Sequence, residues 1–409
     1  MSVITIFSGV YCKSDKIVQK TLAKTGYRLV ADSDIAAKAS KMSGMPEDNI
    51  MKALGGKTSV FNRFTHEKER SIAQLRLALA GMLSEDDLIV SGFSGLLIPR
   101  DITHALHVCI IADAKARMAE AMKSENVSEK EAAGIIEKND MDNFSWVNML
   151  FKTSDPWDAS LYDIVIPTDK VDVTRASEII YENISHEIIQ PTESSKKAVS
   201  DFTVSASVEV AMAKEGHAVG ISSRDGAVTI TINTSVLMLG RLEEELKSIA
   251  LKVPGVKTVE TRVGKGFHKA DIYRKYDFEM PSKVLLVDDE REFVQTLSER
   301  LLMRDMGSAV TYDGESALEL VKEDEPEVMI LDLKMPGIDG IEVLRKIKET
   351  QPAIEIIILT GHGSEADRKI CMDLGAFAYL HKPVDINELS DTIKKANEKI
   401  RQTIGNKTS

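Results

Sequence analysis

The stretch Val284-Leu285-Leu286-Val287-Asp288-Asp289-Glu290 is a short apolar run that stops at two adjacent acids. Three later apolar runs end at Asp332, at Thr360 and just before Lys382. Bounded runs rich in Val and Ile that alternate with helical patterns predict buried parallel strands. In open α/β sheets the functional groups collect at the carboxyl ends of the strands. We therefore expect these polar side chains to meet at one edge of a sheet.

The composition is that of an ordinary globular protein, with 43% hydrophobic and 28% charged residues. Its 409 residues suffice for roughly two to four domains. The net charge of -12 argues against a general nucleic-acid-binding surface, so we expect no DNA partner. No apolar run approaches the roughly 20 residues of a transmembrane helix, and the first residues lack a basic export leader. Three widely spaced cysteines, Cys12, Cys109 and Cys371, show no metal or disulfide spacing and favour a reducing cytoplasm.

Asp288, Asp289 and Asp332 are expected to place three carboxylates at neighbouring strand ends. Such carboxylates repel one another unless a cation lies among them, and oxygen ligands with room for water suit Mg²⁺. A carboxylate can attack phosphorus and form an aspartyl phosphate, while the metal and the Lys382 ammonium neutralise charge on the transferring oxygens. Taken alone, the adjacent acids are equally compatible with capping of the next helix. Their occurrence together with Asp332, Thr360 and Lys382 favours a phospho-acceptor site.

Four motifs mark this C-terminal part: Val287-Asp288-Asp289-Glu290, Leu331-Asp332-Leu333-Lys334-Met335-Pro336-Gly337-Ile338-Asp339-Gly340, Ile358-Leu359-Thr360-Gly361 and Tyr379-Leu380-His381-Lys382-Pro383. On these motifs, residues 282–405 resemble the response-regulator receiver domain over its whole length. The resemblance implies a doubly wound, flavodoxin-like α/β fold with five parallel strands in the order 2-1-3-4-5.

The same resemblance implies a role for each residue of the acidic edge. Asp332 is the expected phospho-acceptor, phosphorylated by a sensor histidine kinase or a phosphotransfer protein. The expected Mg²⁺ ligands are Asp288, Asp289, Asp332 and the backbone carbonyl of Lys334.

The resemblance further implies a conformational switch. Lys382 is expected to pair with the phosphoryl group, and its peptide bond with Pro383 to be cis. Thr360 is expected to move towards the phosphoryl group, so that the ring of Tyr379 turns inward and changes the neighbouring surface.

The N-terminal part, residues 1–185, alternates strand and helix patterns and predicts a parallel sheet. Its first strand is followed by a turn and a helix, which is the setting of a phosphate-binding loop. Lys13 and Ser14 are weak candidates for binding a nucleotide there. The Walker pattern needs two glycines before the lysine, but Phe7 and Cys12 stand at those positions.

Several stretches of this part, among them Ile4-Thr5-Ile6, Ala116-Arg117-Met118 and Leu161 to Asp169, resemble the cytidylate-kinase-like family. The resemblance implies a P-loop nucleoside-monophosphate-kinase fold with a mobile arginine-bearing lid. This chain departs from that pattern, because its loop has the single glycine Gly9 and Met141-Asp142-Asn143 stand where lid arginines are expected. Losing such an arginine lowers phosphoryl transfer by on the order of 10³-fold or more. We therefore expect a degenerate, catalytically silent domain that can still bind a nucleotide or another anion, with four candidate residues: Lys13, Arg63, Arg100 and Arg117.

The middle part begins after a polar stretch, residues 190–197, that reads as a linker. A helix is expected over 204–213, and residues 219–232 alternate in period two across the turn Asp225-Gly226, which predicts a β-hairpin. A second helix and a last strand follow. This order resembles the BON domain, a small α/β interaction module, over residues 200–265. A charged connector, residues 264–281, leads to the receiver-like part.

Taken together, the sequence predicts a two-component response regulator. Its receiver would control the kinase-like and BON-like parts through phosphorylation. Two alternatives stay open: a phospho-regulated nucleoside monophosphate kinase of the cytidylate type, and a scaffold in which phosphorylation controls formation of a homodimer.

Overall fold

The computed structural model of the protein describes residues 2–54, 59–84, 87–153, 155–233, 239–264, 283–304, 306–361 and 363–407. The chain divides into two compact units. The first consists of Met1–Thr58 and Glu67–Arg274, and the second of Ser59–His66 and Lys275–Ser409. The predicted connector, apart from Gly264, lies outside the described residues. Within the described residues, no helix is both long and apolar enough to cross a membrane.

The first unit contains a parallel sheet of five strands, as expected from the alternation of strand and helix patterns. In spatial order the strands are β2 (Arg28–Ala31), β3 (Leu88–Ser91), β1 (Val3–Ser8), β4 (Ala105–Ile111) and β5 (Ile164–Pro167). Because the strand order reverses beside β1, the loop after this strand lies where open α/β sheets bind their ligands.

Helices cover both faces of this sheet, because the central strands β1, β3 and β4 carry buried apolar side chains on both sides. They are α1 (Ser14–Thr25), α2 (Asp32–Ser43), α3 (Glu47–Ala53), α5 (Glu67–Leu83), α6 (Ala114–Glu125), α7 (Glu129–Phe151) and α8 (Val173–Ile184), with the short 3-10 helices η1 (Phe93–Leu97), η2 (Ala159–Leu161) and η3 (Glu187–Ile189). Helices α1 and α8 pack on one face, and α2, α3, α5 and α7 contribute to the core on the other. Local pattern predicts a helix over residues 128–138 that starts at a Ser128–Glu131 capping box. Helix α7 begins at this capping box but continues to Phe151.

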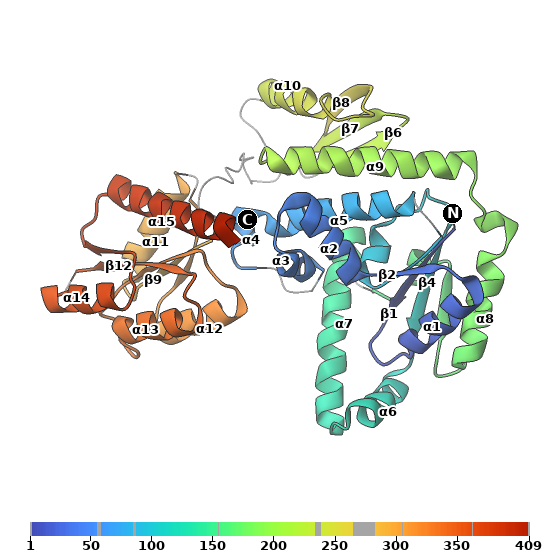
Figure 1. Cartoon of the computed structure of the whole chain (residues 1–409), viewed down its shortest axis with the longest axis horizontal. Helices are drawn as coiled ribbons and strands as arrows, with labels where there is room; N and C mark the ends of the chain where they lie inside the picture. The colour runs from blue at the N-terminus through green and yellow to red at the C-terminus, as the bar shows by residue number, and fades with distance from the viewer. Residues whose placement is uncertain are drawn as a thin grey trace. The chain divides into compact units, whose positions relative to one another are not determined.

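The polar stretch 190–197 is not the linker that its composition suggested. Helix α9 (Glu193–Lys214) begins within it, capped by Thr192 and by a Ser195 side chain that also bonds the buried His104 ring at 2.8 Å. The helix packs along α5 and also against a small three-stranded sheet (Figure 1).

That small sheet has the element order expected for residues 200–265. It consists of β6 (Gly220–Arg224), β7 (Ala227–Ile232) and β8 (Thr258–Val263), with α10 (Leu239–Ala250) before the last strand. Strands β6 and β7 form the predicted antiparallel hairpin, and β8 pairs with β7 in parallel. Asp225 and Gly226 take positive φ values of 57° and 80°, as an Asp-Gly hairpin turn requires. The resemblance to the BON domain remains a prediction.

The second unit contains the doubly wound sheet predicted for the C-terminal part. Its parallel strands are, in spatial order, β10 (Ser308–Thr311), β9 (Val284–Val287), β11 (Val328–Leu331), β12 (Glu355–Thr360) and β13 (Ala378–His381). This is the expected 2-1-3-4-5 order. The helices are α4 (Asn62–Thr65), α11 (Arg291–Leu302), α12 (Gly314–Glu323), α13 (Gly340–Thr350), α14 (Glu365–Asp373) and α15 (Ile386–Lys407). Helices α11 and α15 cover one face of the sheet, and α12, α13 and α14 the other.

Candidate functional site: the acidic edge of the second unit

The acidic residues are placed by the strands that precede them. The backbone N–H of Asp288, just after β9, donates to the Thr311 carbonyl at 3.2 Å, and that of Asp332, just after β11, donates to the Val287 carbonyl at 3.0 Å. The two aspartates therefore lie side by side at the carboxyl edge. The strand order reverses between β9 and β11, so this edge is the position at which such sheets bind ligands.

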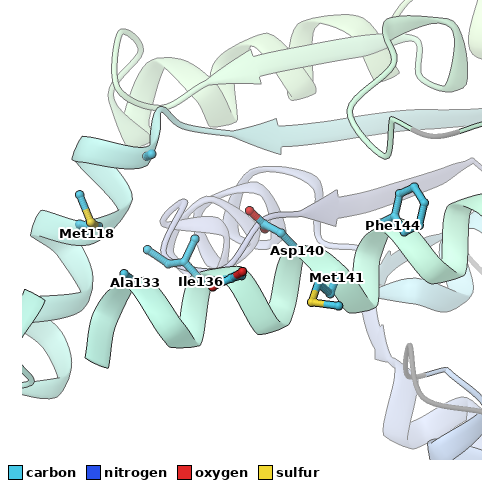
Figure 2. Close-up of a pocket in the computed structure, with 8 residues that line it drawn as sticks. Met118, Ala133, Ile136, Asp140, Met141 and Phe144 are labelled. Atoms are coloured by element: carbon cyan, nitrogen blue, oxygen red, sulfur yellow. The ribbon is translucent and has the colours of Figure 1, made fainter. Parts of the chain in front are cut away.

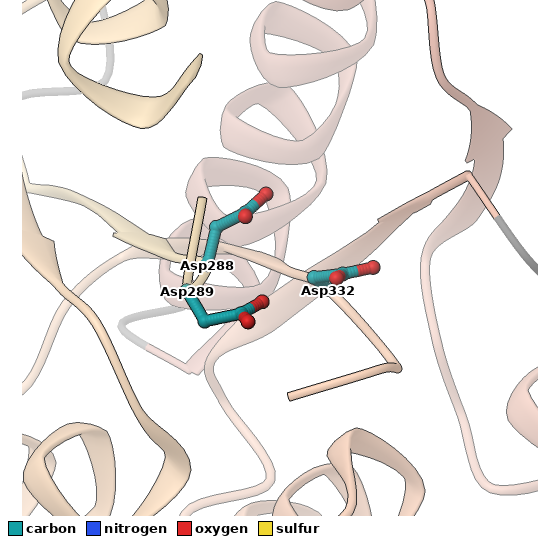
Figure 3. Close-up of side chains that lie close together, drawn as sticks. All are labelled: Asp288, Asp289 and Asp332. Atoms are coloured by element: carbon teal, nitrogen blue, oxygen red, sulfur yellow. The ribbon is translucent and has the colours of Figure 1, made fainter. Parts of the chain in front are cut away.

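Three carboxylates meet at this edge (Figure 3). One oxygen from each of Asp288, Asp289 and Asp332 lies within 4.8 Å of the others. Asp288 and Asp332 are buried, with 4% and 5% of their surface exposed. Burying like charges this close together is unfavourable unless positive charge is supplied.

Lys382 supplies part of that charge. Its Nζ lies 2.7 Å from Asp288 Oδ2, 2.9 Å from Glu290 Oε1 and 3.7 Å from Asp332 Oδ2. The ammonium also lies 4.6 Å from the centre of the Phe293 ring, a favourable cation–π distance. Burial lowers the pKa of Lys382, but its bonds to Asp288 and Glu290 outweigh burial and raise the pKa above its usual value.

The two buried aspartates are held by backbone donors. The N–H of Glu290 donates to Asp288 Oδ1 at 2.9 Å, and the N–H of Leu333 donates to Asp332 Oδ1 at 2.8 Å. Burial raises the pKa of Asp288 above its usual range, although Lys382 acts in the opposite direction. With three carboxylates against one ammonium, the cluster keeps an excess of negative charge directed at one point.

The loop after Asp332 is shaped by close backbone packing. A Cβ atom on Gly340 would lie 2.2 Å from the Asp332 carbonyl oxygen and 2.7 Å from Leu333 Cα. Only glycine lets the start of α13 approach the phospho-acceptor candidate this closely. The backbone of Gly340 also donates to the Leu333 carbonyl at 3.1 Å, which closes the loop.

The predicted switch residues lie on the neighbouring strands β12 and β13. Thr360, the last residue of β12, is fully buried, and its carbonyl accepts from the Lys382 N–H at 2.9 Å. The hydroxyl of Tyr379 is buried, has no hydrogen-bond partner among the residues that the structure describes, and lies so close to Gly363 that a Cβ there would clash with it. Burial raises the pKa of Tyr379. The Lys382–Pro383 bond is cis, as expected.

The loop after β1 leads into helix α1 through two of the N-terminal candidates, Lys13 and Ser14. Lys13 is exposed and stands at the N-cap position of α1 with a left-handed φ of 59°. The neighbouring Ser14 is the first residue of the helix. Phe7, which stands at a Walker glycine position, is core: its ring packs against Phe93 and Tyr162. The Phe7 side chain is therefore part of the hydrophobic core and is not available to a ligand.

The Arg117 side chain lies against this loop. Its guanidinium makes a bidentate pair with Asp140, at 2.8 and 2.7 Å, and its Nε donates to the Val10 carbonyl at 2.9 Å. The N–H of Val10 donates in turn to Asn139 Oδ1 at 3.1 Å. A Cβ on Gly9 would lie 3.2 Å from Arg117 Cζ, so the one glycine of the loop makes room for a guanidinium.

The other two basic candidates of this part are Arg100 and Arg63. Arg100 pairs with Asp163 at 2.7 Å, and the side chain of Arg63 lies outside the described residues. Beside the Arg117–Asp140 pair, a mostly apolar pocket of about 510 Å³ opens between α6 and α7 (Figure 2). It is lined by Ala114, Met118, Ala133, Ile136, Glu137, Asp140, Met141 and Phe144.

Sequence reasoning missed several residues of both sites. Glu290 and Phe293 contact Lys382 but were not among the candidates, although Glu290 directly follows the paired acids. In the N-terminal part, Asp140 and Asn139 were not among the candidates, although they bond Arg117 and the Val10 N–H. Their pairing across 23 and 129 residues of chain leaves no local signal.

Comparison with known families agrees with the geometry of the acidic edge. Residues 284–394 match the family model of the response regulator receiver domain. The C-terminal part is a receiver domain. Residues 3–170 match the family model of the cytidylate kinase-like family. The chain therefore joins a cytidylate kinase-like part to a receiver domain.

Individual proteins are similar to the chain over about a quarter of its length. The response regulator MprA of Mycolicibacterium vanbaalenii is 36% identical over 110 residues, or 27% of this chain and 48% of MprA. The transcriptional regulatory protein CpxR of Escherichia coli (strain K12) is 41% identical over 113 residues, or 28% of this chain and 48% of CpxR. The chain thus spans about half the length of the curated relatives it matches. A solved structure of a response regulator receiver domain protein from Clostridium thermocellum is 33% identical in sequence. The match covers 30% of this chain and 98% of that protein's chain, with a TM-score of 0.29.

Proposed function

We propose that the protein is a two-component response regulator phosphorylated on Asp332 by a partner histidine kinase or phosphotransfer protein. The observation that carries the proposal is the meeting of three carboxylates and the Lys382 ammonium at the carboxyl edge of the receiver sheet. Asp332 is the acceptor because it is buried, lies within reach of Lys382 and has one oxygen fixed by the Leu333 N–H. Its Oδ2 is the oxygen nearer to the ammonium.

The donor set fits Mg²⁺. Asp288, Asp289 and Asp332 offer oxygen ligands only, and their excess negative charge calls for a small divalent cation. The backbone carbonyl of Lys334 is the fourth protein ligand in this proposal. Bound there, the metal supplies positive charge against the oxygens of the transferring phosphoryl group.

The transfer itself is a displacement at phosphorus. An oxygen of Asp332 forms the new P–O bond while the P–N bond of the donor phosphohistidine breaks, and the donor imidazole takes up a proton. Lys382 stabilises the charge on the phosphoryl oxygens, a contribution that requires it to leave or share its contact with Asp288. Thr360 then bonds the phosphoryl group, and Tyr379, whose buried hydroxyl lies against Gly363, reorients as the second half of the switch.

Asp332→Asn tests the acceptor. In the wild-type chain, incubation with acetyl phosphate and Mg²⁺ should add one phosphoryl group, seen as a mass increase of the intact protein. The amide of the variant is not a nucleophile towards phosphorus, so no labelling is expected. Undiminished labelling of the variant would show that another residue is the acceptor.

A matched control is Glu365→Gln in the same domain. Glu365 is exposed in the first turn of α14 and pairs only at the surface with Arg368, at 3.4 Å. This change removes one carboxylate from the receiver without touching the acidic edge. Labelling should equal that of the wild type.

We propose further that the kinase-like part does not transfer phosphate and serves, with the BON-like part, as the output region. Arg117, the buried cation nearest the loop, is already neutralised by Asp140. A coupled assay for ADP formation with ATP, CMP and Mg²⁺ should show no turnover, whether or not beryllofluoride is added. Turnover above the rate without enzyme would favour the phospho-regulated kinase instead.

A further inference from the structure

A short segment of the N-terminal sequence belongs structurally to the receiver unit. Residues Ser59–His66 lie between α3 and α5 in the chain, inside the region that matches the cytidylate kinase-like family. They nevertheless form one compact unit with Lys275–Ser409. The segment contains the single-turn helix α4.

Phe61 anchors this segment in the receiver core. Its side chain is fully buried, and it is a member of the packed cluster between the sheet and helices α12, α13 and α14. Asn62 and Thr65 are also buried, with 7% and 3% of their surface exposed. Phe61 comes from outside the sequence of the receiver domain but is buried in its core, so the segment is bound to that domain.

A polar contact fixes the segment beside its anchor. The backbone N–H of Val60 donates to Asp324 Oδ2 at 2.9 Å. Asp324 caps the C-terminal end of α12, just before β11 begins, and so lies at the sheet edge opposite to Asp332. The contact therefore leaves the phosphorylation edge accessible.

The apolar cluster that holds Phe61 extends to the phosphorylation edge. Leu331 and Leu333, the two residues that flank Asp332, are members of the same cluster, and Tyr379 packs against it. Close-packed interiors transmit small displacements because they contain few voids. A change at Asp332 thus has a continuous packed route to the docked segment.

We propose that residues 59–66 are an intramolecular docking segment, anchored by Phe61, through which the receiver acts on the kinase-like part of its own chain. The proposal rests on the proposed phosphorylation of Asp332 and names its first target. Glu67, which begins α5, follows the segment without a break, so the docked segment leads directly into a core helix of the kinase-like part. By thermodynamic reciprocity, phosphorylation and docking must affect each other by the same factor.

Hydrogen exchange on the full-length chain tests the docking. In the wild type, the amides of residues 59–66 should be protected, including the Val60 N–H. Phe61→Ala should lower their protection by on the order of 100-fold or more, because a buried aromatic anchor is lost. Wild-type protection of this segment in the variant would overturn the proposal.

Val60→Ala is the matched control in the same segment. The Val60 side chain is 51% exposed, and the change keeps the backbone bond to Asp324. Protection should stay at the wild-type level. If Phe61→Ala does not fold, Asp324→Ala gives a milder test, since it removes the acceptor alone and should lower protection of Val60 and its neighbours.

Beryllofluoride binding tests the coupling. With Mg²⁺ present, its affinity for the full chain should differ between wild type and Phe61→Ala by about fivefold or more, the lower bound of typical allosteric coupling. Protection of residues 59–66 should change by the same factor when beryllofluoride binds. An equal affinity in the two proteins would overturn the coupling.

The failure of this proposal can be told from a failure of the proposed function. Asp332→Asn should abolish acetyl-phosphate labelling while leaving residues 59–66 protected. Phe61→Ala should keep the labelling site and lose the protection. Labelling of Asp332→Asn would contradict the proposed function. Equal beryllofluoride affinity in wild type and Phe61→Ala, together with normal labelling of the wild type, would contradict only the docking proposal.

Discussion

The two parallel sheets of this protein place a loop at the same topological position but equip it in opposite ways. In the receiver, Asp288, Asp289 and Asp332 face a single ammonium, that of Lys382. In the kinase-like part, the guanidinium of Arg117 faces a single carboxylate, that of Asp140. The first edge keeps an unbalanced charge and the second is balanced from within.

The difference teaches that strand order alone does not make a site. A ligand-binding edge must leave charge or hydrogen-bonding capacity to be completed by the ligand. Arg117 uses three of its donors on Asp140 and the Val10 carbonyl, and Asn139 accepts the Val10 N–H. Little is left there for a phosphate to complete, whereas the carboxylates of the receiver edge carry more negative charge than the Lys382 ammonium balances.

The largest expected effect comes from removing the Lys382 ammonium from the receiver edge. Lys382→Ala should slow phosphorylation by acetyl phosphate by about 10²- to 10³-fold, the usual loss for one preorganised donor to a transition-state oxygen. The measurement is the rate of mass increase, with folding of the variant checked by circular dichroism. Lys346→Ala, which removes a surface lysine that pairs with Glu342 on the same helix, should leave the rate unchanged.

Breaking the internal balance of the kinase-like loop should have the next largest effect. Asp140→Asn leaves the Arg117 guanidinium buried beside a neutral amide, and should lower the free energy of unfolding by about 2 kcal/mol, since Asp140 is partly exposed. The chain has two tryptophans, Trp146 and Trp157, both in the first unit, so their fluorescence during urea unfolding follows that unit.

The control for this change lies one turn earlier on the same helix. Glu137→Gln alters an exposed carboxylate of α7 and should leave the unfolding midpoint in place. An equal loss of stability in both variants would mean that the charge of α7 matters, not the bond to Arg117.

A smaller effect is expected from the outermost acid of the receiver edge. Asp289→Asn should weaken Mg²⁺ binding, measured by titration calorimetry, by about tenfold or more, because it removes one of the charged oxygen ligands. Glu349→Gln, at an exposed position of α13, serves as the control. Unchanged affinity in Asp289→Asn would remove this residue from the proposed ligand set.

The smallest effect is a pH dependence confined to the first unit. His107 is buried and bonds Thr5 at 3.1 Å; burial first, and then the charge of Arg100, lower its pKa from 6.5 to about 4, against the opposing charge of Asp163. Below pH 6.5 the unfolded chain therefore binds more protons than the folded one, and stability falls as the pH falls. At pH 5.5 the loss should be on the order of 1 kcal/mol relative to pH 7.

His107→Asn supplies the comparison for the pH series. Urea unfolding followed by tryptophan fluorescence at several pH values should show a smaller dependence between pH 7 and pH 5 in this variant. The same slope in both proteins would assign the pH dependence to other groups.

Local pattern was sufficient for much of the fold. The apolar runs before Asp288 and Asp332 became strands of the predicted sheet, and the Asp225-Gly226 turn became the predicted hairpin. In each case the pattern that decides the element lies within the element itself. The acidic edge followed from the same patterns, since the carboxyl ends of neighbouring parallel strands must meet.

What escaped prediction depends on partners far along the chain. Helix α7 continues past Lys138 because Trp146 and Val147 are buried in the core, which no local signal announces. Residues 193–197 look like a linker because they are polar, yet Ser195 bonds His104 across 91 residues. The membership of Phe61 in the receiver unit is of the same kind, because its burial site is built more than 200 residues later.

Helix α9 gives the first unit a mechanical property. Ala198, Val199 and Phe202 belong to the core of the kinase-like sheet, while Val208 and Met212 belong to the core of the small sheet. At about 1.5 Å per residue, its 22 residues form one rod of about 33 Å shared by both cores. The kinase-like part and the small three-stranded sheet therefore have no hinge between them at this helix, and they should melt as one cooperative unit in calorimetry. A displacement of the kinase-like core is therefore transmitted through α9 to the small sheet at the other end of the helix.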